Sequence, residues 1–90
     1  MKGEHKMVFN NNDDLKRFAK ILTKKMENIG EDVLAKELIN WNNDFFTTSS
    51  EFLGELKLIL ERIKQIKSLD AITKKDVTEC IATINRAIIM

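Results

Sequence analysis

The chain has 90 residues, of which 43% are hydrophobic and 32% charged, and its formal net charge is +1. This length accommodates one domain with one core, and so large an apolar fraction excludes an intrinsically disordered chain. Proline is absent and glycine occurs three times, which disfavours a turn-rich β fold and favours an all-α fold.

The first segment, residues 1–11, shows no sustained period, and we expect a short N-terminal tail ahead of a helical domain over residues 12–90. Side-chain oxygens in Asn10–Asp14 can cap the free amides at the start of a helix. Gly30 can adopt the left-handed conformation that ends many helices, so a first helix is predicted over residues 13–29. Its apolar stripe consists of Leu15, Phe18, Leu22, Met26 and Ile29.

Two further apolar stripes predict helices in the middle of the chain. A second helix is expected over residues 31–45, with Leu34, Leu38, Trp41 and Phe45 along its inner face. The hydroxyl of Thr48 and the carboxylate of Glu51 have the spacing of a capping box, which predicts a long third helix over residues 49–68. The third stripe consists of Phe52, Leu56, Ile59, Ile63 and Ile66, flanked by Leu53 and Leu60.

Thr73 and Asp76 repeat the capping-box spacing ahead of a fourth helix that runs to the end of the chain. Its inner face consists of Val77, Ile81, Ile84 and Ile88. Short connections favour antiparallel neighbours, so the sequence predicts an antiparallel four-helix bundle-like single domain. A layered helical-repeat arrangement is the alternative, and no internal repeat supports it.

No catalytic or metal-binding motif is visible, so we expect neither an enzyme nor a cofactor or metal site. His5, the sole histidine, lies in the tail without a nucleophile nearby. Cys80, the sole cysteine, lacks the flanking cations that stabilise a thiolate, which indicates a buried structural thiol and a reducing compartment. No apolar run has the length of a membrane span or signal peptide, so we expect a cytoplasmic protein without a membrane partner.

Charge is distributed unevenly along the chain. Residues 31–61 contain seven acidic and two basic residues, while the segments on either side are net basic. In the predicted first helix, Arg17, Lys20 and Lys24 fall opposite the apolar stripe, a pattern that could follow phosphates but also describes a solvated helix face. Because no aromatic residues interleave with these cations on that face, nucleic acid is the less favoured partner.

The third predicted helix carries the first candidate binding surface. If its stripe faces the core, helical steps of about 100° place Leu58 on the outer face among acidic side chains. An apolar residue inside an acidic rim suits a basic protein partner. A competing interpretation buries Leu58, because a central helix contacts neighbours on both sides. The candidate contacts are Glu51, Gly54, Glu55, Leu58 and Glu61.

Aromatic residues at the end of the second predicted helix form another candidate contact. Trp41, Phe45 and Phe46 lie among asparagines, and aromatic residues are frequent at binding hot spots. The competing interpretation places Trp41 and Phe45 in the core and Phe46 over the turn.

Two segments, Glu37–Trp41 and Thr47–Leu56, resemble small all-helical bacterial immunity proteins that accompany secreted or contact-dependent toxins. The resemblance implies a cytoplasmic inhibitor that neutralises a cognate toxin by occluding its active site or substrate groove, and it transfers no individual binding residue. The acidic middle agrees with this function, because nuclease toxins commonly present basic substrate grooves.

Two alternatives to an inhibitor remain open. One is a homodimeric structural or regulatory helical protein in which Ile39, Leu58 or Ile89 supplies the self-contact. The other is a nucleic-acid-binding regulator that uses the row of Arg17, Lys20 and Lys24.

Overall fold

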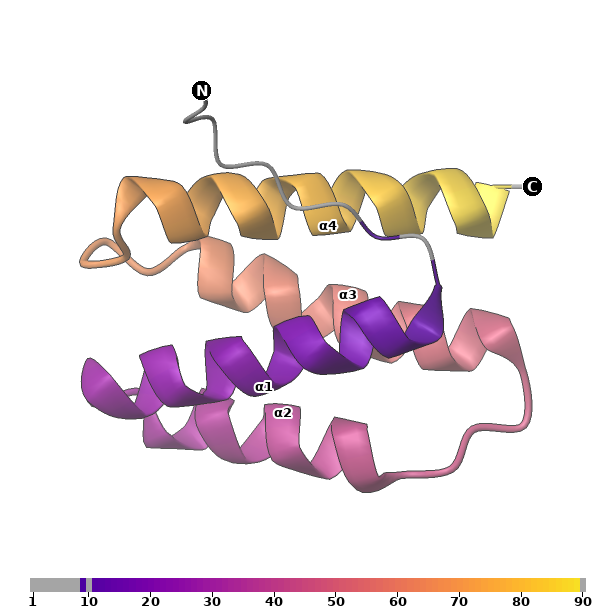
Figure 1. Cartoon of the computed structure of the whole chain (residues 1–90), viewed down its shortest axis with the longest axis horizontal. Coiled ribbons are helices and arrows are strands. Elements are labelled where there is room, and N and C mark those ends of the chain that lie inside the picture. Colours follow the sequence, from indigo (N-terminus) through magenta and orange to yellow (C-terminus); the bar gives the residue numbers. More distant parts are fainter. Residues whose placement is uncertain (1–8, 10, 90) are drawn as a thin grey trace.

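The computed structural model describes Phe9 and residues 11–89, with side chains described to residue 87. This part of the chain forms four helices and no strand (Figure 1). The helices are α1 (Asn12–Asn28), α2 (Asp32–Asn43), α3 (Ser49–Lys64) and α4 (Ala71–Ile89). Successive helices run in opposite directions, which confirms the expected all-α, antiparallel, bundle-like fold.

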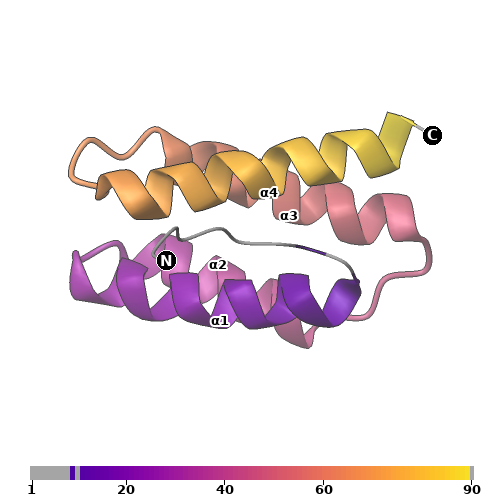
Figure 2. The same ribbon diagram turned by 45° about the horizontal axis from the view of Figure 1, so that its top comes forward.

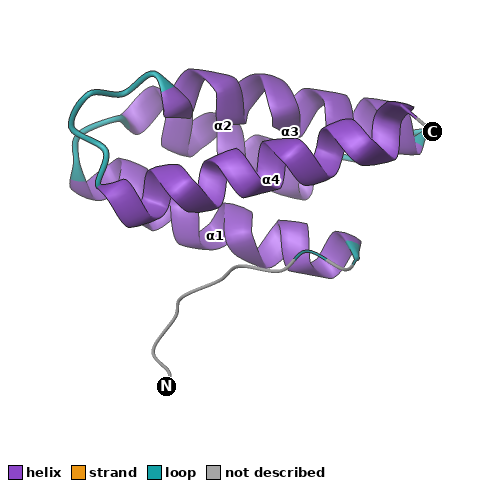
Figure 3. Cartoon of the chain, turned by 90° about the horizontal axis from the view of Figure 1, so that it is seen from above, coloured by secondary structure: helices purple, strands orange, loops and turns teal. Residues whose placement is uncertain are grey.

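The four helices are arranged as two hairpins. α1 packs along α2, α3 packs along α4, and a smaller contact between α2 and α3 joins the two pairs. Figure 2 shows the α1–α2 pair stacked against the α3–α4 pair, and the view from above in Figure 3 shows all four axes running along one common direction. α2 therefore has a helical neighbour on each side.

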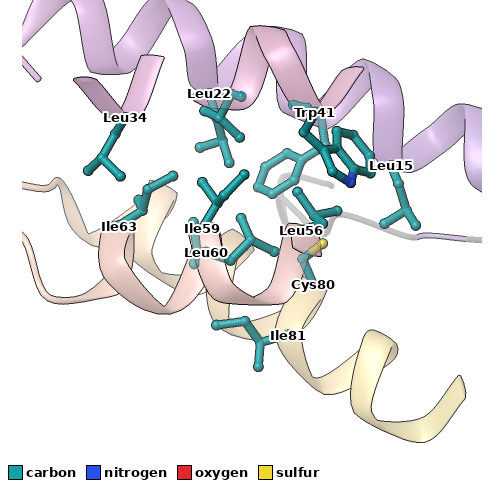
Figure 4. Packing of buried hydrophobic residues seen from close by; sticks show 14 of the residues in the cluster. Leu15, Leu22, Leu34, Trp41, Leu56, Ile59, Leu60, Ile63, Cys80 and Ile81 are labelled. Carbon is teal, nitrogen blue, oxygen red and sulfur yellow. The ribbon is translucent and has the colours of Figure 1, made fainter. Parts of the chain in front are cut away.

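One hydrophobic core lies between the hairpins and takes residues from every helix. Figure 4 shows Leu22 and Leu34 from the first hairpin facing Ile59 and Ile63 from α3. The predicted stripes supply most of this core, and Ala19, Ala35 and Cys80 add to it. The periodicity of the sequence thus identified the inner face of each helix, with exceptions at the helix ends.

The two ends of α1 follow their predicted chemistry. Asn11 caps the helix, since its side-chain oxygen accepts the amide hydrogen of Asp14 at 2.9 Å. At the other end Gly30 has a φ of 82°, and Glu31 N–H donates to the carbonyl of Met26 at 2.8 Å. This is a Schellman ending, which glycine adopts without steric cost because it lacks Cβ. The prediction for Gly30 is confirmed.

The tail residue Phe9 is half-buried against the core. Its ring meets that of Phe18 edge to face, with 5.2 Å between the ring centroids. The predicted tail otherwise lies largely outside the described residues, and so does His5.

The start of α3 is confirmed and its predicted end is wrong. Thr48 is the N-cap, and its hydroxyl oxygen accepts the amide hydrogen of Glu51 at 3.1 Å. The helix ends at Lys64, four residues before the predicted end at 68, where the backbone turns through tighter bonds such as Ile66 N–H to Ile63 C=O. Ile66 still packs on the core from the loop, so the apolar period continues after the helix has ended.

The predicted capping box of α4 is also wrong. Asp70 is the residue that caps the first turn: its carboxylate accepts both the amide hydrogen of Thr73 at 2.9 Å and its hydroxyl hydrogen at 2.7 Å. These bonds from Thr73 hold the pKa of Asp70 below its ordinary value. Thr73 and Asp76 instead lie inside the helix and are buried. An aspartate is as good an N-cap as a threonine, so the spacing alone did not identify the cap.

The end of α2 corrects the placement of an aromatic residue. The helix stops at Asn43 and Asp44 is extended, which shifts the side chains that follow out of the helical period. Phe45 is therefore not in the core but 96% exposed. Phe46 covers the turn as expected, half-buried with its ring centroid 5.7 Å from that of Phe52.

Candidate functional site

The candidate functional site is a groove between α2 and α3, which we call the acidic groove. Its volume is about 590 Å³. The α2–α3 loop lines it with Asp44–Thr47, and Glu37 and Arg62 line it from the two helices. The lining residues are Glu37, Asn40, Trp41, Asp44, Phe45, Phe46, Thr47, Glu51, Glu55, Leu58, Ile59 and Arg62.

Two large apolar side chains in this groove are open to solvent. Phe45 is 96% exposed and Leu58 is 62% exposed. The interpretation that buried Leu58 is wrong, because the neighbours α2 and α4 cover the flanks of α3 and leave its outer side uncovered. Single exposed apolar residues are common, but a phenyl ring and a leucine in one groove provide a shared contact area for a partner.

Carboxylates surround these apolar side chains. Glu55 is exposed, and no described residue forms a hydrogen bond or ion pair with it. Glu37 accepts a hydrogen bond from Arg62 at 2.6 Å, and Asp44 accepts the amide hydrogen of Phe45 at 2.9 Å. Glu55 is therefore the carboxylate that a cationic partner can engage without breaking an existing bond.

Glu51 has a structural role as well as a position in the groove. Its carboxylate accepts the hydroxyl hydrogen of Thr47. This bond, followed by smaller contributions from Thr47 and Thr48 backbone contacts, lowers the pKa of Glu51 despite some desolvation. Glu51 thus remains ionised while it completes the cap of α3, and a substitution there changes the helix start together with the groove charge.

The structure brings together four of the six candidate residues and separates the other two. Glu51, Glu55, Leu58 and Trp41 line the acidic groove. Gly54 and Glu61 do not: both are half-buried and neither lines the groove. Of the five candidate residues on α3, only Glu51, Glu55 and Leu58 therefore belong to the groove.

Trp41 forms part of the groove wall while belonging to the core. It is 4% exposed, and its indole Nε1–H donates to the carbonyl oxygen of Phe52 at 2.9 Å. The two rings also pack with 4.7 Å between centroids. This confirms the core interpretation of Trp41, so the exposed aromatic contact of the groove is Phe45.

Phe45 was predicted both as a candidate contact and, in the competing interpretation, as a core residue, and its exposure contradicts the core interpretation. Glu37, Asp44 and Arg62 were not predicted as groove residues. A signal for Phe45 was present: Asn42, Asn43 and Asp44 are weak helix formers immediately before it. Reading that run as a helix end would have removed Phe45 from the inner stripe. The approach of Glu37 to Arg62 carried no local signal, because the two are 25 residues apart in sequence.

A second groove, which we call the basic groove, lies between α1 and α2 and has a volume of about 840 Å³. It contains the predicted row of Arg17, Lys20 and Lys24, all of which are exposed. On the α2 side, Asn42 donates to the backbone carbonyl of Lys16 at 3.0 Å, and Ile39 is 42% exposed. The lining residues are Asp13, Lys16, Arg17, Lys20, Thr23, Lys24, Glu27, Ile39, Asn42 and Asn43.

The described residues that line the two grooves include no histidine or cysteine. Cys80 is buried in the core beneath α3, and burial raises the pKa of its thiol to about 12. Figure 4 shows its sulfur beside Leu56. Among residues 11–87, no cluster of histidine, cysteine and carboxylate side chains could hold a metal ion. None of the helices in the described part of the chain has the length and apolarity to cross a membrane.

Comparison of the chain with family models, with curated proteins and with solved structures finds no match.

Proposed function

We propose that this chain is a protein-binding module whose acidic groove receives a basic segment of a partner protein. The observation that carries the proposal is the exposure of Phe45 and Leu58 in one groove with the unengaged carboxylate of Glu55. Charge complementarity speeds the encounter of two proteins, and burial of apolar side chains slows their separation. The groove combines both kinds of contact.

The most concrete form of this proposal is an immunity-type inhibitor that acts in the cytoplasm. Its partner is a toxin domain with a basic substrate groove, which the chain occludes by binding rather than by catalysis. The sequence resemblance in Glu37–Trp41 and Thr47–Leu56 supports this form, since both segments contribute residues to the acidic groove. Phosphate-binding toxin domains expose the lysine and arginine side chains that such a groove attracts.

A pull-down with three matched forms of the chain as bait tests the proposal. Wild type, Glu55→Lys and Glu61→Lys are immobilised separately and exposed to lysate of the source cell. The two substitutions lie on one helix and change the net charge equally, but only Glu55 lines the groove. We expect a basic protein that wild type and Glu61→Lys retain and that Glu55→Lys loses.

Kinetics with the purified partner then separate the two kinds of contact. Glu55→Lys should slow association by about tenfold at low salt, and less at high salt because ions screen exposed charges. Leu58→Ala should chiefly accelerate dissociation while the melting temperature stays close to wild type. An unchanged association rate for Glu55→Lys would reject the acidic groove as the binding site.

Inhibition requires a separate measurement. If the partner is a toxin, its expression alone should stop growth, and co-expression of wild-type chain should restore growth more effectively than Glu55→Lys. A retained partner whose activity is unaffected by binding would leave a protein-binding module and reject the inhibitor.

A defined probe of the same chemistry is a peptide in which lysine and arginine flank leucine side chains, which we call the basic peptide. A control peptide replaces its leucines with serine. The groove should bind the basic peptide more tightly, because only that peptide can cover Phe45 and Leu58.

A further inference from the structure

The two grooves are opposite in charge and lie on opposite flanks of α2. Among the residues that the structure describes, four carboxylates and one cation line the acidic groove, and four cations and two carboxylates line the basic groove. Each also contains exposed apolar surface, from Phe45 and Leu58 in one and from Ile39 in the other. One molecule therefore carries both halves of a complementary pair of surfaces.

We propose that the acidic groove of one copy binds the basic groove of a second copy, in a weak head-to-tail contact that masks the acidic groove until a basic partner displaces it. The masking part rests on the proposed function, whereas the self-contact stands on the two grooves alone. Because the two surfaces differ, the contact is heterologous: one junction leaves one groove of each kind free.

The lining of the basic groove favours a protein surface over nucleic acid. Asp13 and Glu27 line it and repel phosphates, and the described residues of its lining include no aromatic side chain on which a base could stack. Its α2 wall instead offers Ile39 with the amides of Asn42 and Asn43, a mixture typical of protein contacts.

The self-contact should be weak and sensitive to salt. Most of its charges are exposed, so ions at physiological strength screen them. Several are also engaged already: Arg17 pairs with Asp14, and Arg62 pairs with Glu37. Glu55 and Lys20 have no such partner among the described residues, and they are the positions at which a charge reversal tests the contact most cleanly.

Sedimentation of the full chain over a range of protein concentrations and two salt concentrations measures this contact. Wild type should show a mean mass that rises with concentration at low salt and falls towards the monomer at high salt. Glu55→Lys alone and Lys20→Glu alone should each weaken association at least about tenfold, which corresponds to about 1.4 kcal/mol. The controls Glu61→Lys and Lys75→Glu, outside both grooves, should behave as wild type.

A mixture of the two variants provides the sharper result. Glu55→Lys retains an intact basic groove and Lys20→Glu an intact acidic groove, so an equimolar mixture should recover the junction between these two grooves and associate more strongly than either variant alone. Far-ultraviolet circular dichroism and melting establish that each variant is folded. A monomeric wild type, or a mixture that does not associate, would overturn the self-contact.

Two further binding measurements, with an oligonucleotide and with the basic peptide, distinguish the self-contact from a nucleic-acid surface and from the proposed function. Loss of single-stranded oligonucleotide binding in Lys20→Glu, with a monomeric wild type, would overturn the self-contact in favour of a nucleic-acid surface. Binding of the basic peptide to Lys20→Glu tests the proposed function separately, because this variant keeps the acidic groove. Peptide binding by Lys20→Glu with a monomeric wild type would overturn the self-contact alone. Self-association of wild type with no peptide binding by Lys20→Glu would overturn the proposed function and the masking while leaving the contact itself.

Discussion

The acidic and basic grooves share α2 as a wall but differ in what their other wall supplies. On the α1 side, the cations of Arg17, Lys20 and Lys24 follow a regular helix surface, and the exposed apolar residue beside them is Ile39. On the α3 side, the early end of α2 places Phe45 in solvent near Leu58. The comparison teaches that both grooves combine charges with exposed apolar surface, but the acidic groove has two exposed apolar side chains and the basic groove has one, so the acidic groove offers the larger apolar contact to a partner.

The largest expected effect is a loss of fold stability from substitutions in the core, on which both grooves depend. Leu56→Ala or Ile63→Ala should lower the free energy of unfolding by about 2–5 kcal/mol, because each leaves a cavity in the core that fixes α3. Chemical denaturation measures the loss. By contrast, Leu58→Ala should stay within about 0.5 kcal/mol of wild type, since its side chain is exposed. A large loss for Leu58→Ala would mean that the residue is buried and does not belong to the groove surface.

A smaller effect is expected from removing the N-cap of α3 or of α1, the helices that line the acidic and basic grooves opposite α2. Thr48 caps α3, which forms one wall of the acidic groove, and Asn11 caps α1, which forms one wall of the basic groove. Thr48→Ala and Asn11→Ala should each cost about 0.5–2 kcal/mol of stability, because each leaves an amide at a helix start without its side-chain acceptor. Thr48→Ala should also weaken binding of the basic peptide, and Asn11→Ala should not. Equal effects of the two variants on peptide binding would contradict the assignment of the peptide to the α3 side.

The acidic side should also respond to pH through Glu51. Hydrogen bonds, chiefly from the Thr47 hydroxyl, lower its pKa below the ordinary 4.5. A lowered folded-state pKa contributes stability that is present above the unfolded-state value and lost as the pH falls through the folded-state value. The stability difference between wild type and Glu51→Gln should therefore be present at neutral pH and shrink in the acidic range below 4.5. Denaturant midpoints across pH check this, and a constant difference would reject the role of the ionised carboxylate.

The smallest expected effect concerns the rate at which a thiol reagent labels Cys80, which the groove substitutions should leave unchanged. The Cys80 thiol is buried, and its pKa is raised to about 12, so a thiol reagent should label it only after the chain opens. Glu55→Lys and Lys20→Glu should retain the wild-type labelling rate, because neither touches the core, while Leu56→Ala should accelerate labelling. Faster labelling of either groove variant would show that its binding defect includes a loss of stability.

The sequence predicted the buried faces of the helices better than the positions of the helix ends, and the end of α2 shows why. The inner faces of all four helices follow from the spacing of residues such as Leu22, Leu38, Leu60 and Ile84, because burial dominates the energetics of a small domain. The end of α2 did not follow, since the apolar period continues to Phe45 while the weak helix formers before it stop the helix. Apolar spacing alone cannot decide between these opposing signals.

The candidate site was partly predictable for a related reason. A single helix determines which residues of α3 share a face, so Glu55 and Leu58 were correctly grouped. The other wall depends on how α2 packs against α3, and Glu37 and Arg62, which are 25 residues apart in sequence, meet only in the folded chain. Glu61 was included because the sequence does not reveal which side of α3 is adjacent to α2.

A titration of isotopically labelled Lys20→Glu with the basic peptide, followed by amide chemical shifts, tests the central claim most directly. This variant keeps the acidic groove and lacks an intact basic groove, so the free groove is available whether or not wild type self-associates. We predict saturable shifts over Asp44–Thr47 and at Glu55 and Leu58, with α1 unaffected. Shifts confined to α1, or no saturable shift along the acidic groove, would contradict the account.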